Sequence, residues 1–205
     1  MARVTRTGPM LVALLAVLAA VPGCIIFDPR HPEPPTTGAQ VTYLPQTSSA
    51  NVWANLETSL NNTHAQGWQD NISQTAFSYE PDSAADTQFP GVFAGWDIER
   101  EATFINNFYN AGVTIEAKMK DDAYTPPPDV GSETVWEGVI YDVKVTDPVD
   151  SSVTEYRGSA IITFKQEGNF WYISNWRDQQ GESSPENPGQ ILSTMGVLRG
   201  TFASK

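Results

Sequence analysis

The chain has 205 residues, and its 24 acidic side chains outnumber its 12 basic ones, which gives a net charge of -12 at neutral pH. This charge argues against a nucleic-acid partner, because phosphates would be repelled and the basic residues are spaced singly. The single cysteine, Cys24, excludes a disulfide within the chain, so the fold must be stabilised by packing. The length fits one domain with a flanking segment, and six Trp, seven Tyr and nine Phe supply an aromatic core.

The N-terminal segment has the layout of an export signal. Arg3 and Arg6 give a positive start, and residues 10–20 form an apolar stretch too short to span a bilayer. Val-Pro-Gly-Cys at 21–24 then resembles the cleavage site of bacterial lipoprotein signal peptides, although proline stands where that family usually has Ala or Ser. The resemblance implies cleavage after residue 23 and acylation of Cys24. The alternatives are an ordinary secretory signal or an uncleaved anchor, with an incidental thiol.

The lipoprotein resemblance also implies a location, the cell envelope, at the periplasmic face of the outer membrane in a host with two membranes. Residues 24–48 contain five prolines and little to bury, which predicts an anchor followed by an extended tether. The folded domain is then expected over residues 49–205.

The first half of this domain is predicted to be mainly helical. Val52, Trp53, Leu56 and Leu60 recur at helical spacing after Ser48 and Ser49, and a short helix is expected over 65–70. A strand over 75–80 and a turn-rich stretch over 81–95 follow. Asp97 is then expected to cap a longer helix, with Glu99 and Glu101 at the positive end of its dipole.

Everything from residue 113 onward is predicted to be sheet. Four segments rich in β-branched and aromatic residues predict strands over 113–120, 134–146, 153–166 and 170–178. Their loops favour antiparallel pairing, and the length of the two middle strands favours a strongly bent sheet.

The order of these elements resembles that of the nuclear transport factor 2-like superfamily, which includes SnoaL-like polyketide cyclases. The resemblance is carried locally by the ending Trp171-x-Ile-x-x-Trp-x-Asp178, the early helix Asn51-Val-Trp-Ala-Asn-Leu, Trp68 and Phe77. The resemblance covers about residues 50–202. It implies an α+β, cystatin-like fold in which a cone-shaped antiparallel sheet wraps around three N-terminal helices. The cone interior serves catalysis, ligand binding or packing in that superfamily, so the fold leaves the function open. Seven apolar residues are expected to line a pocket or form the core: Trp53, Leu56, Trp68, Phe77, Phe108, Trp171 and Trp176.

Glu137 and Tyr141 are the candidate catalytic pair. Alternation along the strand places both on its more apolar side, where an acid and a phenol can polarise a carbonyl and move a proton. The alternative is that Glu137 pairs with Arg157 across the sheet. Asp178 is expected to cap the loop after the last strand, and His64 to lie in solvent at the end of the first helix.

The leading hypothesis is a lipid-anchored module that binds a small apolar ligand or a protein partner without catalysis. The first alternative is a cofactor-free isomerase, cyclase or dehydratase, and the second is a structural envelope component that forms homodimers. No cofactor is expected, and no metal, because Asp121, Asp122 and the acids of 82–86 lack the spacing of a calcium loop.

The anchor can be tested by changing Cys24→Ala. Stable anchoring needs acyl chains, so the variant should move from the membrane fraction to a soluble or unprocessed pool. Fractionation and mass spectrometry of the N-terminal peptide measure this. Unchanged membrane association of the variant would contradict acylation as the anchor.

Overall fold

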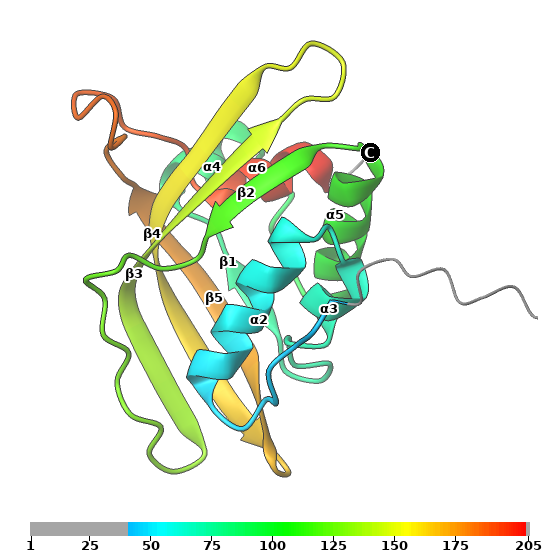
Figure 1. Cartoon of the computed structure of the whole chain (residues 1–205), viewed down its shortest axis with the longest axis vertical. Helices are drawn as coiled ribbons and strands as arrows, with labels where there is room; N and C mark the ends of the chain where they lie inside the picture. The colour runs from blue at the N-terminus through cyan, green and yellow to red at the C-terminus, as the bar shows by residue number, and fades with distance from the viewer. Residues whose placement is uncertain (1–40, 204–205) are drawn as a thin grey trace, which may run out of the picture. The chain divides into compact units, whose positions relative to one another are not determined.

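A five-stranded sheet in the order β1-β5-β4-β3-β2 organises residues 41–203, the part of the chain that the computed structural model describes (Figure 1). The predicted signal, Cys24 and the first part of the predicted tether lie outside these residues. The antiparallel strands are β2 (Thr114–Lys118), β3 (Glu133–Thr146), β4 (Val153–Glu167) and β5 (Phe170–Gly181). Short β1 (Ser78–Glu80) pairs in parallel with β5, so the expectation of a wholly antiparallel sheet is wrong at this edge.

Three helices precede β2 in the places that the sequence predicts: α2 (Ser49–Asn61), α3 (Ala65–Gln69) and α5 (Ile98–Asn110). The Ser48 side chain accepts a hydrogen bond from the N–H of Asn51, and Asp97 accepts from the N–H groups of Glu99 and Arg100. Helix α2 packs against β5 and β2, and α3 packs against α2 and α5 (Figure 1). The predicted α+β class, with a bent sheet around helices, is confirmed.

Two further helices were not predicted. Helix α4 (Ser83–Gln88) lies in the stretch expected to be turns, and α6 (Met195–Phe202) lies where only sheet was expected. Thr194 caps α6 by accepting a hydrogen bond from the N–H of Gly196. Helix α6 packs against α4, α5 and β4, which brings the C-terminal part of the chain onto the core.

Two β-bulges decide which side chains face the helices. Pairing of β3 with β4 shifts between Trp136 and Val139, where Gly138 has a positive φ of 64°. Pairing of β4 with β5 shifts where Ser174 is the extra residue of β5. As a result Trp171, Ile173, Trp176 and Asp178 are all buried, although a regular strand could not turn all four to one face.

Residues 41–48, expected as the end of the tether, pack against the domain. The N–H of Leu44 donates to Asn55 Oδ1 at 2.8 Å, and the N–H of Trp171 donates to the carbonyl oxygen of Gln46 at 2.8 Å. The folded part therefore includes residues before the predicted boundary at 49. None of the helices within residues 41–203 has the length and hydropathy needed to cross a membrane.

Trp176 is central to this packing, because its ring contacts those of Trp53 and Trp68 at centroid distances of 5.2 Å and 6.1 Å. Trp176→Ala should destabilise the domain by about 3–5 kcal/mol, since a fully buried ring is replaced by a cavity. Phe170→Ala is the matched control, because Phe170 lies on the same strand and is 47% exposed. Denaturant unfolding measures both, and equal stabilities would contradict this account of the core.

Candidate functional site

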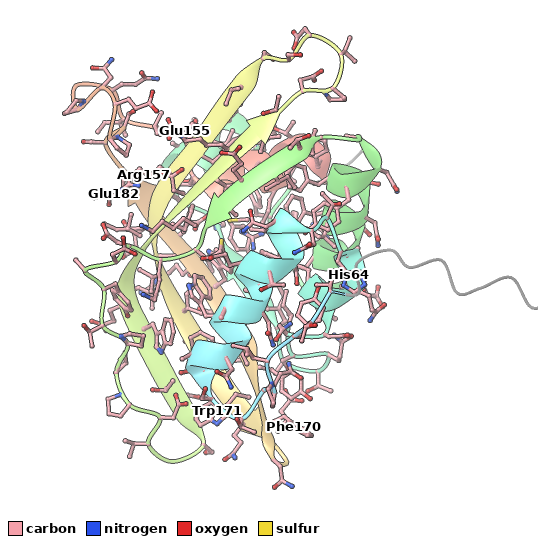
Figure 2. All side chains as sticks on the ribbon, viewed as in Figure 1. His64, Glu155, Arg157, Phe170, Trp171 and Glu182 are labelled. Atoms are coloured by element: carbon pink, nitrogen blue, oxygen red, sulfur yellow. The ribbon has the colours of Figure 1, made fainter. Side chains whose placement is uncertain are left out.

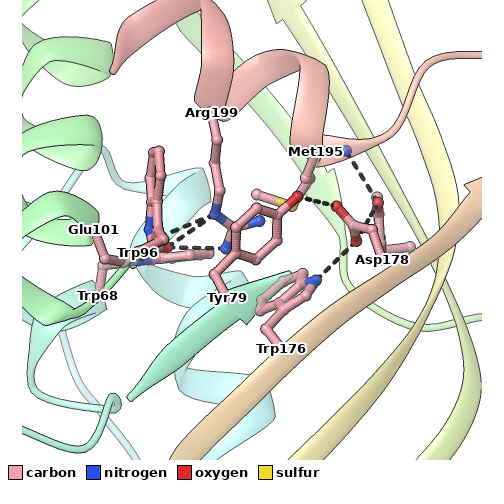
Figure 3. Close-up of polar contacts among 9 residues, drawn as sticks. Trp68, Tyr79, Trp96, Glu101, Trp176, Asp178, Met195 and Arg199 are labelled. Carbon is pink, nitrogen blue, oxygen red and sulfur yellow. Dashed lines mark hydrogen bonds and ion pairs between the residues drawn. The ribbon is translucent and has the colours of Figure 1, made fainter. Parts of the chain in front are cut away.

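A buried ion pair joins α5 to α6. Glu101 and Arg199 are both fully inaccessible to solvent, and Arg199 Nη2 lies 2.9 Å from Glu101 Oε1 (Figure 3). The Nε atom of Arg199 also donates to Glu101 Oε2 at 3.0 Å. Two indole N–H groups complete the shell of the carboxylate, from Trp68 at 3.1 Å and from Trp96 at 2.8 Å. Such a shell is what a buried carboxylate requires.

Aromatic rings enclose the guanidinium group. The Cζ atom of Arg199 lies 4.2 Å from the ring centroid of Tyr79 and 4.4 Å from that of Trp176. Both rings present their faces to the cation, which is the geometry of a cation–π contact. Burial opposes the charged form, yet the adjacent Glu101 carboxylate holds the pKa of Arg199 above its ordinary value.

A second buried acid lies on the other side of Tyr79. Asp178 accepts hydrogen bonds from the hydroxyls of Tyr79 at 2.7 Å and Tyr141 at 2.8 Å, and from the indole N–H of Trp176 at 2.8 Å (Figure 3). The N–H of Met195, at the start of α6, donates to the hydroxyl oxygen of Tyr141 at 3.0 Å. We call Tyr79, Glu101, Tyr141, Asp178 and Arg199 the polar centre.

The pKa values of the acid Asp178 and of the two phenols Tyr79 and Tyr141 are all raised. Burial raises the pKa of Asp178, against the opposing effect of Arg199 and of the three donors. Burial also raises the pKa of Tyr79 and Tyr141, and the nearby Asp178 charge adds to both shifts. An acid and two phenols in contact can pass a proton between them, but every one of these side chains is at most 3% exposed.

Tyr141 therefore lies beside an acid, but this acid is Asp178 and not the expected Glu137. The expectation that Glu137 shares the apolar face with Tyr141 is wrong, because the bulge at Gly138 shifts the alternation and leaves Glu137 exposed. The expected pair of Glu137 with Arg157 is also wrong, since Arg157 Nη1 lies 2.8 Å from Asp142 Oδ2 on the neighbouring strand.

The seven residues expected to form a pocket or the core are buried, with exposures between 0% and 6%. The rings of Trp53, Trp136, Phe164 and Trp176 contact one another inside the curved sheet, with centroid distances between 4.9 Å and 6.2 Å. These side chains fill the interior of the cone. Their placement is that of a packed core.

Sequence reasoning missed three members of the polar centre. Glu101 falls three and four residues before Phe104 and Ile105, so helical spacing places it on the buried face of α5. In Trp171-x-Ile-x-x-Trp-x-Asp178, two residues instead of one separate Ile173 from Trp176. This break in the alternation indicates the β5 bulge that turns Asp178 inward. The burial of Arg199 can be predicted only when α6 is recognised as a helix, with Thr194 as its cap and Met195 and Leu198 on its buried side.

A surface cleft of ≈ 660 Å³ adjoins the polar centre, and Tyr79, Phe93 and Trp96 contribute to its wall together with Glu80 and Asp86. The three aromatic residues are at most 5% exposed, so they present little of their own surface to the cleft. Elsewhere, His64 is the residue before α3, and its Nδ1 lies 2.7 Å from the hydroxyl of Tyr43. Among residues 41–203, no three His, Cys, Asp or Glu side chains gather closely enough to hold a metal ion.

No protein-family model and no curated protein sequence matches this chain. A conserved protein from Planctomyces limnophilus is similar in structure, with a TM-score of 0.51 and 14% identity over 63% of this chain and 91% of its own. The Δ5-3-ketosteroid isomerase from a Mycobacterium species gives a TM-score of 0.45 at 15% identity, over 66% of this chain and 92% of its own. A protein from Nostoc punctiforme with a cystatin-like fold gives 0.41 at 11%, over 69% and 92%. The likeness to the Planctomyces limnophilus protein concerns the fold alone, an α+β arrangement with a curved sheet around helices.

Asp178→Asn should destabilise the domain by about 1–3 kcal/mol at neutral pH, because an amide nitrogen cannot accept from the donors that surround it. The pKa of Asp178 is higher in the folded than in the unfolded chain, so ionisation disfavours folding. The advantage of wild type over the variant should be largest below about pH 4 and shrink as the pH rises through the raised pKa. Glu137→Gln, at an exposed position, should change stability by less than about 0.5 kcal/mol. Chemical denaturation from pH 3 to 8 measures all three proteins, and a pH-independent difference would contradict the shift.

Proposed function

We propose that this chain is a lipid-anchored envelope protein whose folded domain binds a protein partner on its outer surface and performs no catalysis. The observation that carries the proposal is the closure of the cone by α6. Arg199 extends from that helix between the rings of Tyr79 and Trp176, and its guanidinium group occupies the space beside the buried acids. A ligand bound in the cone would have to displace this ion pair.

The packing of α6 supports a permanent closure. Gly196 lies against the hydroxyl of Tyr79 and the methyl group of Ala85, and Gly200 lies against the ring of Phe89, at distances that leave no room for a Cβ atom. Leu198 is fully buried on the same helix. Glycine at these two positions lets the helix approach the core closely, which favours α6 as a constituent of the core.

The charge and the predicted tether agree with a role outside the cone. A strongly negative domain stays soluble beside a membrane, and residues 24–40 are long enough to hold it away from the lipid surface. Because side chains fill the interior, a partner would have to bind at the outer face or at the edges of the sheet.

One observation favours a second candidate, an acid/base enzyme. Asp178 has a raised pKa and contacts two phenols, which is a set of groups suited to moving a proton next to a carbonyl. This candidate requires α6 to leave the core during each reaction cycle. The burial of the whole polar centre argues for the binding module.

Turnover of an apolar carbonyl compound separates the two candidates. We expect no conversion of a β,γ-unsaturated cyclic ketone to its conjugated isomer, measured by ultraviolet absorbance, because no substrate reaches Asp178. Asp178→Asn and Glu137→Gln serve as controls for the buried and the exposed acid. Conversion by wild type and by Glu137→Gln that is lost in folded Asp178→Asn would overturn the proposal in favour of the enzyme.

A further inference from the structure

The first residues of β4 have a free edge. Strand β5 pairs with β4 only as far as Gly158, and beyond it the N–H of Arg157 donates to the carbonyl oxygen of Ser193 at 2.8 Å. Backbone groups alternate in direction along a strand, so the N–H and C=O groups of Val153 and Glu155 point to the same side as those of Arg157. Ser193 of the returning chain bridges Tyr156 in parallel, so its N–H faces the carbonyl oxygen of Glu155. The N–H of Glu155 and both backbone groups of Val153 have no backbone hydrogen bond to another segment of residues 41–203.

The path of the chain after β5 explains the opening. A Cβ atom at Gly181 would overlap the carbonyl oxygen of Leu192, so only glycine lets the returning chain cross here. Residues 182–193 leave the sheet as an arm, in which Ser183 pairs with Ile191, and come back beside Tyr156. Figure 2 shows Glu155, Arg157 and Glu182 near the point where the arm departs.

A groove of ≈ 430 Å³ lies between this arm and the free edge. Its walls include Val153, Thr154 and Glu155 on the strand and Glu186, Ile191 and Ser193 on the arm. Val153 and Ile191 are 62% and 65% exposed, so both present apolar surface to the groove. The groove thus combines unpaired backbone groups with apolar surface.

Two other sheet edges in the described residues are covered at one residue each, whereas residues 133–141 of β3 have no strand on the side away from β4. At β2, Asn61 from helix α2 accepts from the N–H of Ala117 at 2.7 Å and donates to its carbonyl oxygen at 3.0 Å, as a neighbouring strand would. At β1, the N–H of Tyr79 donates to the carbonyl oxygen of Trp96. Open edges invite pairing with another chain, and proteins usually block them. The β4 edge lacks such a block at Val153, beyond the point where Ser193 reaches the strand.

The charge of the groove selects the occupant. Two carboxylates line it, those of Glu155 and Glu186, and no Lys or Arg does. Lys144 approaches both from the neighbouring strand, at 3.4 Å from Glu155 and 3.2 Å from Glu186, which leaves an excess of negative charge. A basic side chain in the groove complements that excess.

We propose that this groove binds an extended segment of a partner protein, which adds as a strand to the edge of β4. An apolar side chain of the segment lies over Val153 and Ile191, and a Lys or Arg two positions away lies at Glu155 and Glu186. The spacing follows from the strand, because Val153 and Glu155 are on the same face. This inference rests on the proposed function and names the surface that serves it.

The probe is the end-capped peptide acetyl-Thr-Val-Thr-Lys-Thr-amide, titrated into the folded chain and followed by the amide resonances of the protein. We expect shifts confined to Val153, Thr154, Glu155 and the arm, together with slower hydrogen exchange at the amides of Val153 and Glu155. Glu155→Pro removes an outward N–H that the sheet does not use, so it should abolish these changes while the fold remains. Glu186→Lys should weaken binding about twofold to fivefold, the effect of one exposed ion pair.

Glu137→Lys is the matched control, because it makes the same charge change at an exposed position of β3 outside the groove. It should bind the peptide as wild type does. Equal weakening by Glu137→Lys and Glu186→Lys, or no shift at millimolar peptide, would overturn the proposal. A wild-type dimer in sedimentation that Glu155→Pro dissociates would replace the partner segment with a second copy of this chain. If the peptide does not bind and the ketone is not converted, only this surface is rejected. If the ketone is converted, the proposed function is rejected.

Discussion

The ion pair between Glu101 and Arg199 is the interaction on which the closed interior depends. Two charges are withdrawn completely from water, and their attraction offsets the loss of hydration only in good geometry with further hydrogen bonds. Trp68 and Trp96 supply those bonds to the carboxylate. Loss of either charged partner would leave the other buried and uncompensated. The pair therefore binds α6 to α5 in one register, and α6 in turn closes the cone.

The second buried acid extends the same network across the sheet. Asp178 on β5 joins β1 through Tyr79 and β3 through Tyr141, and Tyr141 accepts from the first N–H of α6. Three elements and the closing helix thus meet at one carboxylate. Groups that would make an acid/base site in an open cone here satisfy one another, which is why we place the function on the outside of the domain.

Small irregularities of the sheet determine both its interior and its exterior. The bulge at Gly138 turns Glu137 to solvent while Tyr141 stays inside, and the extra residue Ser174 turns Asp178 inward. At Gly181 the returning chain crosses the end of β5, and it reaches β4 only at Tyr156, so Val153 has no neighbouring segment on its outer side. A single-residue shift in a strand exchanges its two faces, so the two bulges decide which side chains are buried and which are exposed.

Local patterns in the sequence determined the helices α2, α3 and α5, the strands β2 to β5 and the fold class, since capping residues and side-chain periodicity act over a few neighbouring residues. They also determined that Tyr141 and the seven apolar residues are buried. The pairing of Tyr141 with Asp178, and of Glu101 with Arg199, was decided by tertiary structure, because the partners lie 37 and 98 residues apart. Helix α6 has eight residues and little intrinsic stability, so its formation depends on the core that it closes. The bulges likewise follow from strand pairing, and only that pairing places Glu137 outside and Asp178 within.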